Sequence, residues 1–138
     1  MAQETKKIQT LVSDLVIQPE YDGILDGIEA FSHALILYWP HLLPDHGRTL
    51  RKVHPIGRKE FPLVGIFSTC SPARPNPVLV TAAQIINRQN NILRVQGLEA
   101  VSGSPIIDIK PYTSAYCQVK NFKVSDWMAR IQQAMSEA

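Results

Sequence analysis

Prolines at positions 72, 75 and 77 constrain this chain more than any other feature of its sequence. They follow an apolar run at residues 63–67, whose branched and aromatic side chains predict a buried strand. Each proline fixes its own φ angle and keeps the preceding residue out of the helical region. We therefore expect a stiff loop that projects Arg74 and Asn76, a guanidinium and an amide, from a strand end. Binding groups often sit on such loops. The simpler alternative is that Arg74 is a solvated surface charge.

Short apolar segments separated by turn signals predict strands along most of the chain. Further strands are expected at residues 15–17, 33–39, 50–54, 78–87, 92–98 and 105–110. Asn90 and Asn91 tolerate positive φ angles and lie between two of these segments, which predicts a hairpin. Residues 21–30 predict one short, weak helix, because Gly23 and Gly27 interrupt its apolar spacing.

The end of the chain predicts a terminal amphipathic helix at residues 125–136. Ser125 suits the N-cap position, and Trp127, Met128 and Ile131 fall on one face. We expect one domain over residues 1–138, with irregular chain at 1–13. Six or seven short strands with little helix predict an all-β fold, a barrel or sandwich with helices as accessories.

The composition is typical of an ordinary soluble domain. Of 138 residues, 45% are hydrophobic and 19% are charged, enough for a real core without staples. Cys70 and Cys117 give no disulfide framework, which is usual for a reducing compartment. No apolar run is long enough to span a bilayer, and residues 1–10 lack the apolar core of a leader. The sequence therefore predicts a cytoplasmic protein with no membrane partner.

Charge is distributed unevenly along the chain. The net charge is only +2, which argues against a protein that holds nucleic acid through bulk electrostatics. Basic residues nevertheless gather at residues 48–59, which we call the basic segment: Arg48, Arg51, Lys52, His54, Arg58 and Lys59. This segment could contact a few phosphates, or it could be a solvated loop and strand face.

Several common kinds of site are not indicated. No two of the seven glycines are one residue apart, which argues against a Rossmann nucleotide turn, and there is no phosphate-binding loop. The histidines, His33, His41, His46 and His54, lack the spacing of metal-ligand pairs, so no metal is expected. Cys70 has no base beside it in the sequence, so a nucleophilic cysteine is not favoured.

Three separated motifs resemble a known family. Residues 65–77, Gly-Ile-Phe-Ser-Thr-Cys-Ser-Pro-Ala-Arg-Pro-Asn-Pro, are similar to the signature of the TsaA-like, or TrmO-like, family of S-adenosylmethionine-dependent tRNA methyltransferases. Residues 28–33 and 103–112 also resemble family motifs, in the family's order, so the likeness covers roughly Asp14 to Tyr112. It implies a small closed β-barrel, a homodimer, S-adenosylmethionine as cofactor and tRNA as partner. The acceptor it implies is threonylcarbamoyl-adenosine beside the anticodon.

The resemblance also implies which residues form the site. Cofactor contacts are expected, by motif position, from His41, Leu42, Cys70, Val80, Gln96, Gly97, Leu98 and Glu99. Arg74 and Asn76 are the residues expected to orient the acceptor, and Tyr112 would stack on a base or order the loop. Methyl transfer is an in-line displacement that needs mainly positioning, and the basic segment would meet the anticodon-stem phosphates.

Simpler structural roles are open for some of these residues. Core packing is an equal alternative for Val80 and Leu98, and capping of a strand end is one for His41. Asp108 and Lys110, in the third motif, are expected to be a structural pair or exposed strand residues.

The sequence departs from the family pattern in four places. The family begins with an extra strand and loop before the equivalent of Leu15, and residues 1–13 are too short to supply them. Cys70 stands where the family usually has arginine, and Leu79 where it has glycine. Ser102 replaces an acid.

Three functions therefore stay open. The first is a tRNA methyltransferase of this family. The second is an enzyme of the same fold that uses S-adenosylmethionine on a small molecule. The third is a non-catalytic binding protein that has lost the cofactor groove.

Overall fold

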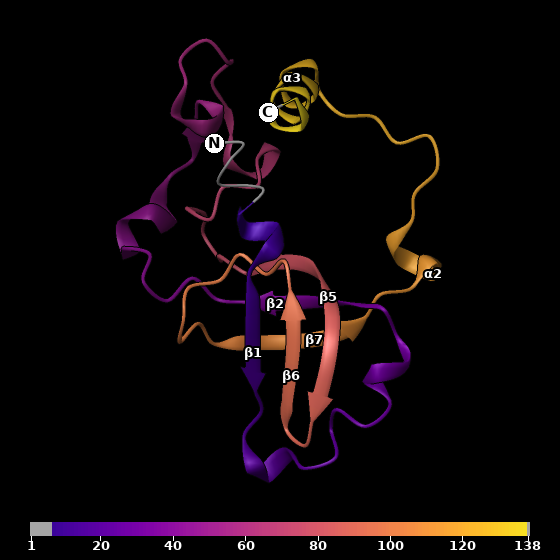
Figure 1. Ribbon diagram of the computed structural model, residues 1–138. Helices are drawn as coiled ribbons and strands as arrows, with labels where there is room; N and C mark the ends of the chain where they lie inside the picture. The colour runs from indigo at the N-terminus through magenta and orange to yellow at the C-terminus, as the bar shows by residue number, and fades with distance from the viewer. Residues whose placement is uncertain (1–6, 138) are drawn as a thin grey trace.

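An antiparallel sheet is the main element of the protein (Figure 1). The computed structural model describes residues 7–137, apart from the side chains at 116 and 117. In spatial order, the five strands are β1 (Val12–Val16), β6 (Ile92–Gln96), β5 (Leu79–Gln89), β2 (His33–Tyr38) and β7 (Ile106–Pro111). All four pairings between neighbours are antiparallel. The β-rich fold is therefore confirmed, and each of these strands overlaps a predicted one.

The sheet bends but is not closed by the pairings that the structure shows. β1 and β7 are its outer strands, and each pairs with one neighbour within residues 7–137. In Figure 1, β2 and β7 run across the direction of β1 and β6. β5 links both directions, because residues 79–84 pair with β2 and residues 84–89 pair with β6. Its register shifts between Ile85 and Asn87, a bulge that lets the strand curve. The closed barrel is not confirmed.

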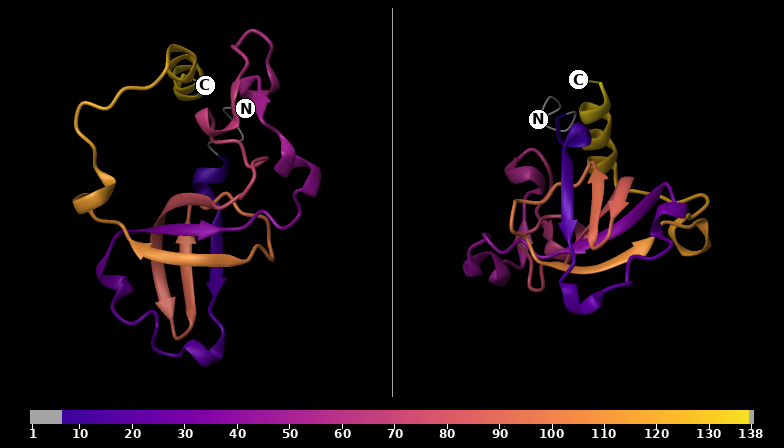
Figure 2. Two further views of the ribbon diagram at one scale, coloured as in Figure 1. Left: turned by 180° about the vertical axis from the view of Figure 1, so that it is seen from behind. Right: turned by 60° about the horizontal axis from the view of Figure 1, so that its bottom comes forward.

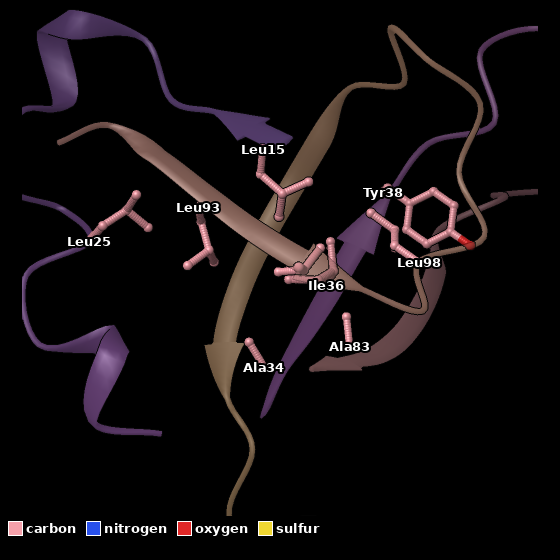
Figure 3. Close-up of a cluster of buried hydrophobic side chains, with 9 residues drawn as sticks. Leu15, Leu25, Ala34, Ile36, Tyr38, Ala83, Leu93 and Leu98 are labelled. Carbon is pink, nitrogen blue, oxygen red and sulfur yellow. The ribbon is translucent and has the colours of Figure 1, made fainter. Parts of the chain in front are cut away.

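The core lies inside this bend (Figure 3). Successive side chains of a strand point to opposite faces, so every second residue of β2 is inward. Ala34 and Ile36 are fully buried and Tyr38 is 5% exposed. Leu15 of β1 and Leu93 of β6 meet them from the crossing strands. Burial of this apolar surface is what holds the two directions of the sheet together.

Two 3-10 turns replace the short helix predicted for residues 21–30. They are η1 (Pro19–Tyr21) and η2 (Ile28–Ala30). Gly23 and Gly27 have φ angles of 84° and 89°, left-handed values that interrupt a helix. The segment still reaches the core, because Leu25 is 5% exposed and packs in the main apolar cluster.

Ion pairs tie this segment and β1 to the sheet. Arg88 Nε lies 3.1 Å from Glu29 Oε2, and Arg88 Nη1 lies 3.1 Å from Asp26 Oδ1. Arg94 of β6 binds Asp14 of β1 with both carboxylate oxygens engaged. Hydrogen bonds from Arg88 lower the pKa of Glu29, and those from Arg94 lower the pKa of Asp14. Both carboxylates therefore stabilise the fold in their charged form.

Arg88→Met should make stability less dependent on acid pH. Because the folded pKa of Glu29 is lowered, its contribution is present above the usual carboxyl range and is lost as pH falls through the folded value. The thermal midpoint of the variant should lie below that of the wild type near about pH 7, and the gap should close below about pH 3. Thermal unfolding followed by circular dichroism at several pH values measures this. A gap that is constant with pH would contradict it.

The segment before the proline loop differs from the predicted strand. β4 (Val64–Gly65) is only two residues long and pairs with β3 (Lys52–Val53), a similarly shortened version of the strand expected at 50–54. The chain then enters the 3-10 turn η5 (Ile66–Ser68). Ile66 is 5% exposed, whereas Phe67 is 77% exposed. The prediction of a buried strand through residue 67 is therefore wrong.

The hairpin and the terminal helix are confirmed. Asn90 has a φ of 53° in the turn between β5 and β6. Helix α3 (Asp126–Ser136) begins after Ser125, whose hydroxyl accepts a hydrogen bond from the Met128 amide. A short helix α2 (Ser114–Cys117) was not predicted.

Helix α3 lies away from the five-stranded sheet, on the side of the β3–β4 segment (Figure 2). Ile131 is its buried residue, and the Arg130 guanidinium lies 5.2 Å from the centre of the Phe61 ring. None of the helices within residues 7–137 is long and apolar enough to cross a membrane.

The start of the chain is more regular than predicted. Residues 7–10 are helical and β1 begins at Val12, whereas irregular chain was expected through residue 13. Residues 1–6 of that prediction lie outside the described residues.

Candidate functional site

A pocket of about 800 Å³ opens beside the end of β2. Four segments that are distant in the sequence contribute its walls, within residues 38–44, 69–74, 78–81 and 99–104. The β2–β5 pairing brings the first and third together, since Tyr38 lies opposite Leu79. The second is the start of the proline loop, and the fourth follows β6. Each of these four segments carries at least one of the site residues predicted from the sequence.

Most of the predicted cofactor residues and one predicted acceptor residue line this pocket. They are His41, Leu42, Cys70, Arg74, Val80 and Glu99. Leu42 is 67% exposed and Val80 is 60% exposed, so neither is a core residue. Glu99 is exposed as well, and its carboxylate stands on a pocket whose other walls are largely apolar. Their roles as cofactor contacts stay predictions.

Other predicted site residues lie elsewhere. Leu98 is 2% exposed in the main core, which favours the core-packing alternative that its sequence left open. Gln96 ends β6 with its side-chain amide on the Gln9 carbonyl, and Gly97 takes a φ of 90° to turn the chain. Neither of them lines the pocket.

Tyr112 lies at the opposite end of β2 from the pocket. Its amide donates to the His33 carbonyl at 3.0 Å, and its ring meets the His33 ring edge-on with centroids 6.5 Å apart. His33 is the first residue of β2, whereas Tyr38, beside the pocket, is the last. The structure therefore does not bring Tyr112 together with Arg74, and its role in stacking on a base or ordering the loop stays a prediction.

Tyr38 organises the pocket, although no pattern in the sequence predicted this role. Its hydroxyl donates to the Glu99 carbonyl at 2.8 Å and lies 3.3 Å from the Thr81 hydroxyl. These contacts join the ends of β2 and β5 to the segment after β6. A buried tyrosine needs a partner for its hydroxyl, so a tyrosine within the apolar run at 33–39 was the available signal.

Hydrogen bonds within the proline loop hold Arg74 in place. Arg74 Nη1 donates to the carbonyls of Thr69 at 2.9 Å and Ser71 at 3.3 Å. The Thr69 hydroxyl accepts from the Ser71 amide, and the Ser71 hydroxyl accepts from the Ala73 amide. These bonds fit the stiff loop that the prolines predict, and part of the Arg74 fork serves the loop itself rather than a ligand.

Arg48 connects the basic segment to the same loop. Its Nε donates to the Pro75 carbonyl at 2.8 Å, and its Nη2 lies 3.5 Å from Asn76 Oδ1. Its guanidinium also lies 5.6 Å from the Trp39 ring centre. Asn76 therefore faces Arg48 and does not line the pocket. Arg48 itself lies in the 3-10 turn η3 (Asp45–Thr49).

η3 packs closely on the proline loop. Gly47 is buried there, and a Cβ at this position would lie 3.3 Å from the Ala73 Cβ. That contact is tighter than most side chains accept, so glycine allows the two segments to approach. It keeps the basic segment beside the pocket.

A larger hollow of about 1580 Å³ lies against β1, β7 and the residues between β1 and β2. Leu98 is the one predicted site residue on its lining. Three of its carboxylates are already neutralised, since Asp14, Asp26 and Asp108 form ion pairs with Arg94, Arg88 and Lys110. The Lys110 ammonium also lowers the pKa of Asp108, as expected for the structural pair. The smaller pocket holds five of the eight predicted cofactor residues together with Arg74, whereas this hollow holds Leu98 alone among the predicted site residues, so the smaller pocket is the better candidate.

Metal binding and a reactive cysteine find no support in the described part of the chain. Within it, no group of three or more His, Cys, Asp or Glu side chains could hold an ion. Cys70 is exposed on the pocket wall.

A family model described as "tRNA-methyltransferase O N-terminal domain" matches residues 2–117. The chain belongs to this family. The helix α3 lies beyond the matched residues.

Similar proteins carry related names. A "Probable S-adenosyl-L-methionine-binding protein" of Methanothermobacter thermautotrophicus is 47% identical over 100 residues, which cover 72% of this chain and 69% of that protein. A "tRNA (adenine(37)-N6)-methyltransferase" of Mus musculus is 36% identical over 106 residues, covering 77% of this chain but only 24% of that protein. The crystal structure of TrmO from Pseudomonas aeruginosa superposes with a TM-score of 0.67 at 23% identity, covering 89% of this chain and 51% of that one. That likeness shows the fold, and this chain spans about half of the solved structure.

Arg74→Lys should loosen the proline loop although it keeps the charge. Both hydrogen bonds come from Arg74 Nη1, and the ammonium of lysine, on a shorter and more flexible stem, would hold the Thr69 and Ser71 carbonyls less firmly. The loss of about 1.5 kcal/mol of charge-assisted hydrogen bonding corresponds to about tenfold faster amide exchange at Ser71 and Ala73. Hydrogen–deuterium exchange measures it, with Arg51→Lys as the matched control. Equal rates in the two variants would contradict this role for Arg74.

Proposed function

We propose that this protein is an S-adenosylmethionine-dependent methyltransferase acting on tRNA, and that the 800 Å³ pocket holds the cofactor. The observation that carries the proposal is the meeting of the family's signature loop with residues 38–44, 78–81 and 99–104 around that one pocket. Family membership and the names of the relatives support the same cofactor and partner.

The residues on the pocket fit the chemistry of S-adenosylmethionine. Its adenine needs an apolar slot, to which Leu42 and Val80 would contribute. Its ammonium and sulfonium are cations and need carbonyl oxygens or a carboxylate, which the Glu99 segment would provide. A volume of about 800 Å³ lies within the range of about 300–1,000 Å³ that is usual for sites of small ligands. A glycine-rich turn is not needed for such a grip.

Methyl transfer asks little of the protein beyond placement. The acceptor nitrogen attacks the methyl carbon in line with the carbon–sulfur bond, that bond breaks, and the nitrogen loses a proton. The cofactor supplies the activated methyl group, and the protein holds the acceptor and excludes water. The amide-like nitrogen of threonylcarbamoyl-adenosine, our proposed acceptor, is a weak nucleophile, so desolvation and orientation matter more than a general base.

The basic segment is our proposed contact for the tRNA backbone. Arg48, Arg51, Lys52, Arg58 and Lys59 are all exposed. Arg48 joins this segment to the proline loop beside the pocket, so phosphates bound along it would place a nucleotide near the pocket mouth. Such contacts weaken steeply with salt. The homodimer and the cytoplasmic location stay predictions from the sequence.

Val80→Arg should prevent cofactor binding. The side chain of Val80 lines the pocket and is 60% exposed, so arginine there fills the cavity and adds a cation beside the sulfonium without disturbing the core. Isothermal titration with S-adenosylmethionine should give an affinity at least about tenfold weaker than wild type. Val119→Arg, at a position 67% exposed on the link to α3, is the matched control and should bind normally. No binding by the wild type would favour the non-catalytic alternative.

Methyl transfer should depend on the acceptor and on salt. With methyl-labelled S-adenosylmethionine, we expect label in tRNA that carries threonylcarbamoyl-adenosine and none in tRNA that carries plain adenosine at that position. Binding of bulk tRNA should weaken by about tenfold or more between low and physiological salt if several phosphates are contacted. Cofactor binding without tRNA binding would favour the small-molecule enzyme.

A further inference from the structure

Phe67 is the most exposed large apolar side chain of the described residues, and it belongs to the signature loop. It is 77% exposed. The 3-10 turn η5 explains why: Ile66 is 5% exposed and anchors the turn in the interior, so the next side chain points to solvent. Leaving a phenylalanine in water forgoes the stabilisation that its burial would give. Neither the core nor the pocket wall uses this ring.

One face of the Phe67 ring is covered by Arg74. The guanidinium carbon of Arg74 lies 5.7 Å from the ring centre. The Arg74 hydrogen bonds to the Thr69 and Ser71 carbonyls keep that guanidinium from moving away. The ring is therefore backed by a fixed cation on one side, and its large exposure leaves the other face open to solvent. A cation on one face of a ring leaves the other face available for a second contact.

The position of the ring relates it to the pocket and to the basic segment. Thr69, Cys70 and Arg74 line the pocket, so Phe67 stands at the edge of that wall. The loop continues to Pro75, whose carbonyl is held by Arg48. The ring and a fixed cation thus lie on one stiff loop beside the proposed methyl donor, and Arg48 joins the basic segment to that loop.

We propose that the open face of Phe67 stacks on a nucleobase of the RNA substrate and so positions the acceptor at the pocket mouth. This inference rests on the proposed function and assigns a positioning residue for it. Proteins that read unpaired RNA stack splayed bases on aromatic rings or on guanidinium planes, and Phe67 with Arg74 offers both in a rigid unit. Nearby basic residues would hold the phosphates on either side of the stacked base. A small acceptor without a base would have no use for this ring.

The test compares Phe67→Ala, Phe67→Leu and Phe67→Tyr with a matched control. Phe122→Ala removes another exposed phenylalanine, 73% exposed on the link to α3 and away from the pocket. The probe is an RNA stem–loop with an unpaired adenosine in its loop, replaced by fluorescent 2-aminopurine so that stacking quenches its emission. Isothermal titration with S-adenosylmethionine is run on every variant.

We expect the alanine and leucine variants to bind the stem–loop about tenfold or more weakly and to lose most of the quenching. The tyrosine variant, which keeps the ring, should stay within about threefold of wild type. Phe122→Ala should match the wild type, and all four should bind S-adenosylmethionine normally. Loss of binding in Phe67→Leu, which keeps apolar volume but not the ring, separates stacking from simple packing.

Three outcomes would overturn the proposal. One is wild-type affinity and quenching in Phe67→Ala, which leaves the proposed function intact. Another is a change in sedimentation mass in that variant, which would assign the ring to a contact between copies of this chain. The last is a wild-type protein that does not bind the stem–loop. If it also fails to bind S-adenosylmethionine, the proposed function is removed together with this inference.

Discussion

The hydroxyl of Tyr38 is the interaction on which the candidate site depends. It lies at the end of the central strand β2 and reaches both the Glu99 carbonyl and the Thr81 hydroxyl. It joins the segment after β6 to this end of the sheet through a side chain, beside the backbone hydrogen bond from the Trp39 amide to the Pro105 carbonyl. Tyr38 is 5% exposed, and a buried hydroxyl needs a hydrogen-bond partner, because one without a partner costs about 1–3 kcal/mol. The same requirement that stabilises the core therefore shapes one wall of the pocket.

The proline loop meets the pocket with most of its polarity already satisfied internally. Thr69, Ser71 and Arg74 satisfy one another, while Arg48 holds the far end of the loop. Such a loop loses little conformational freedom when a ligand arrives. The Arg74 guanidinium therefore contributes by fixing the Thr69 and Ser71 carbonyls as well as by its charge. Prolines and internal hydrogen bonds supply the rigidity that a glycine-rich turn cannot.

Local patterns predicted most of the sheet but not the turns between its strands. The β-branched run at 78–87 and the asparagine turn at Asn90 are local signals, and the structure has β5 and its hairpin there. Residues 63–67 failed because an apolar run does not reveal a 3-10 turn, in which Ile66 faces inward and Phe67 outward. Barrel closure is not confirmed, and it depends on more than local sequence. Whether two outer strands pair depends on how far the whole sheet curls, which no single segment encodes.

The sequence predicted only some of the residues on the pocket, because other contacts of the site come from topology rather than from local patterns. Motif resemblance indicated His41, Cys70, Val80 and Glu99, which four separate segments do bring to one pocket. The resemblance did not indicate that Tyr112, which follows β7, lies at the end of β2 opposite the pocket. Tyr38 was missed because its importance comes from partners more than forty positions away along the chain. Contacts of that span follow from topology rather than from spacing.

Strand β5 makes the pocket and the distant end of the molecule a single cooperative unit. Val80 stands on the pocket at its start, and Arg88 grips the residues between β1 and β2 near its end. One strand lies between them, paired first with β2 and then with β6, so local fraying at one end is opposed by ion pairs at the other. A ligand held at the start of β5 would therefore slow the opening of a surface that it never touches.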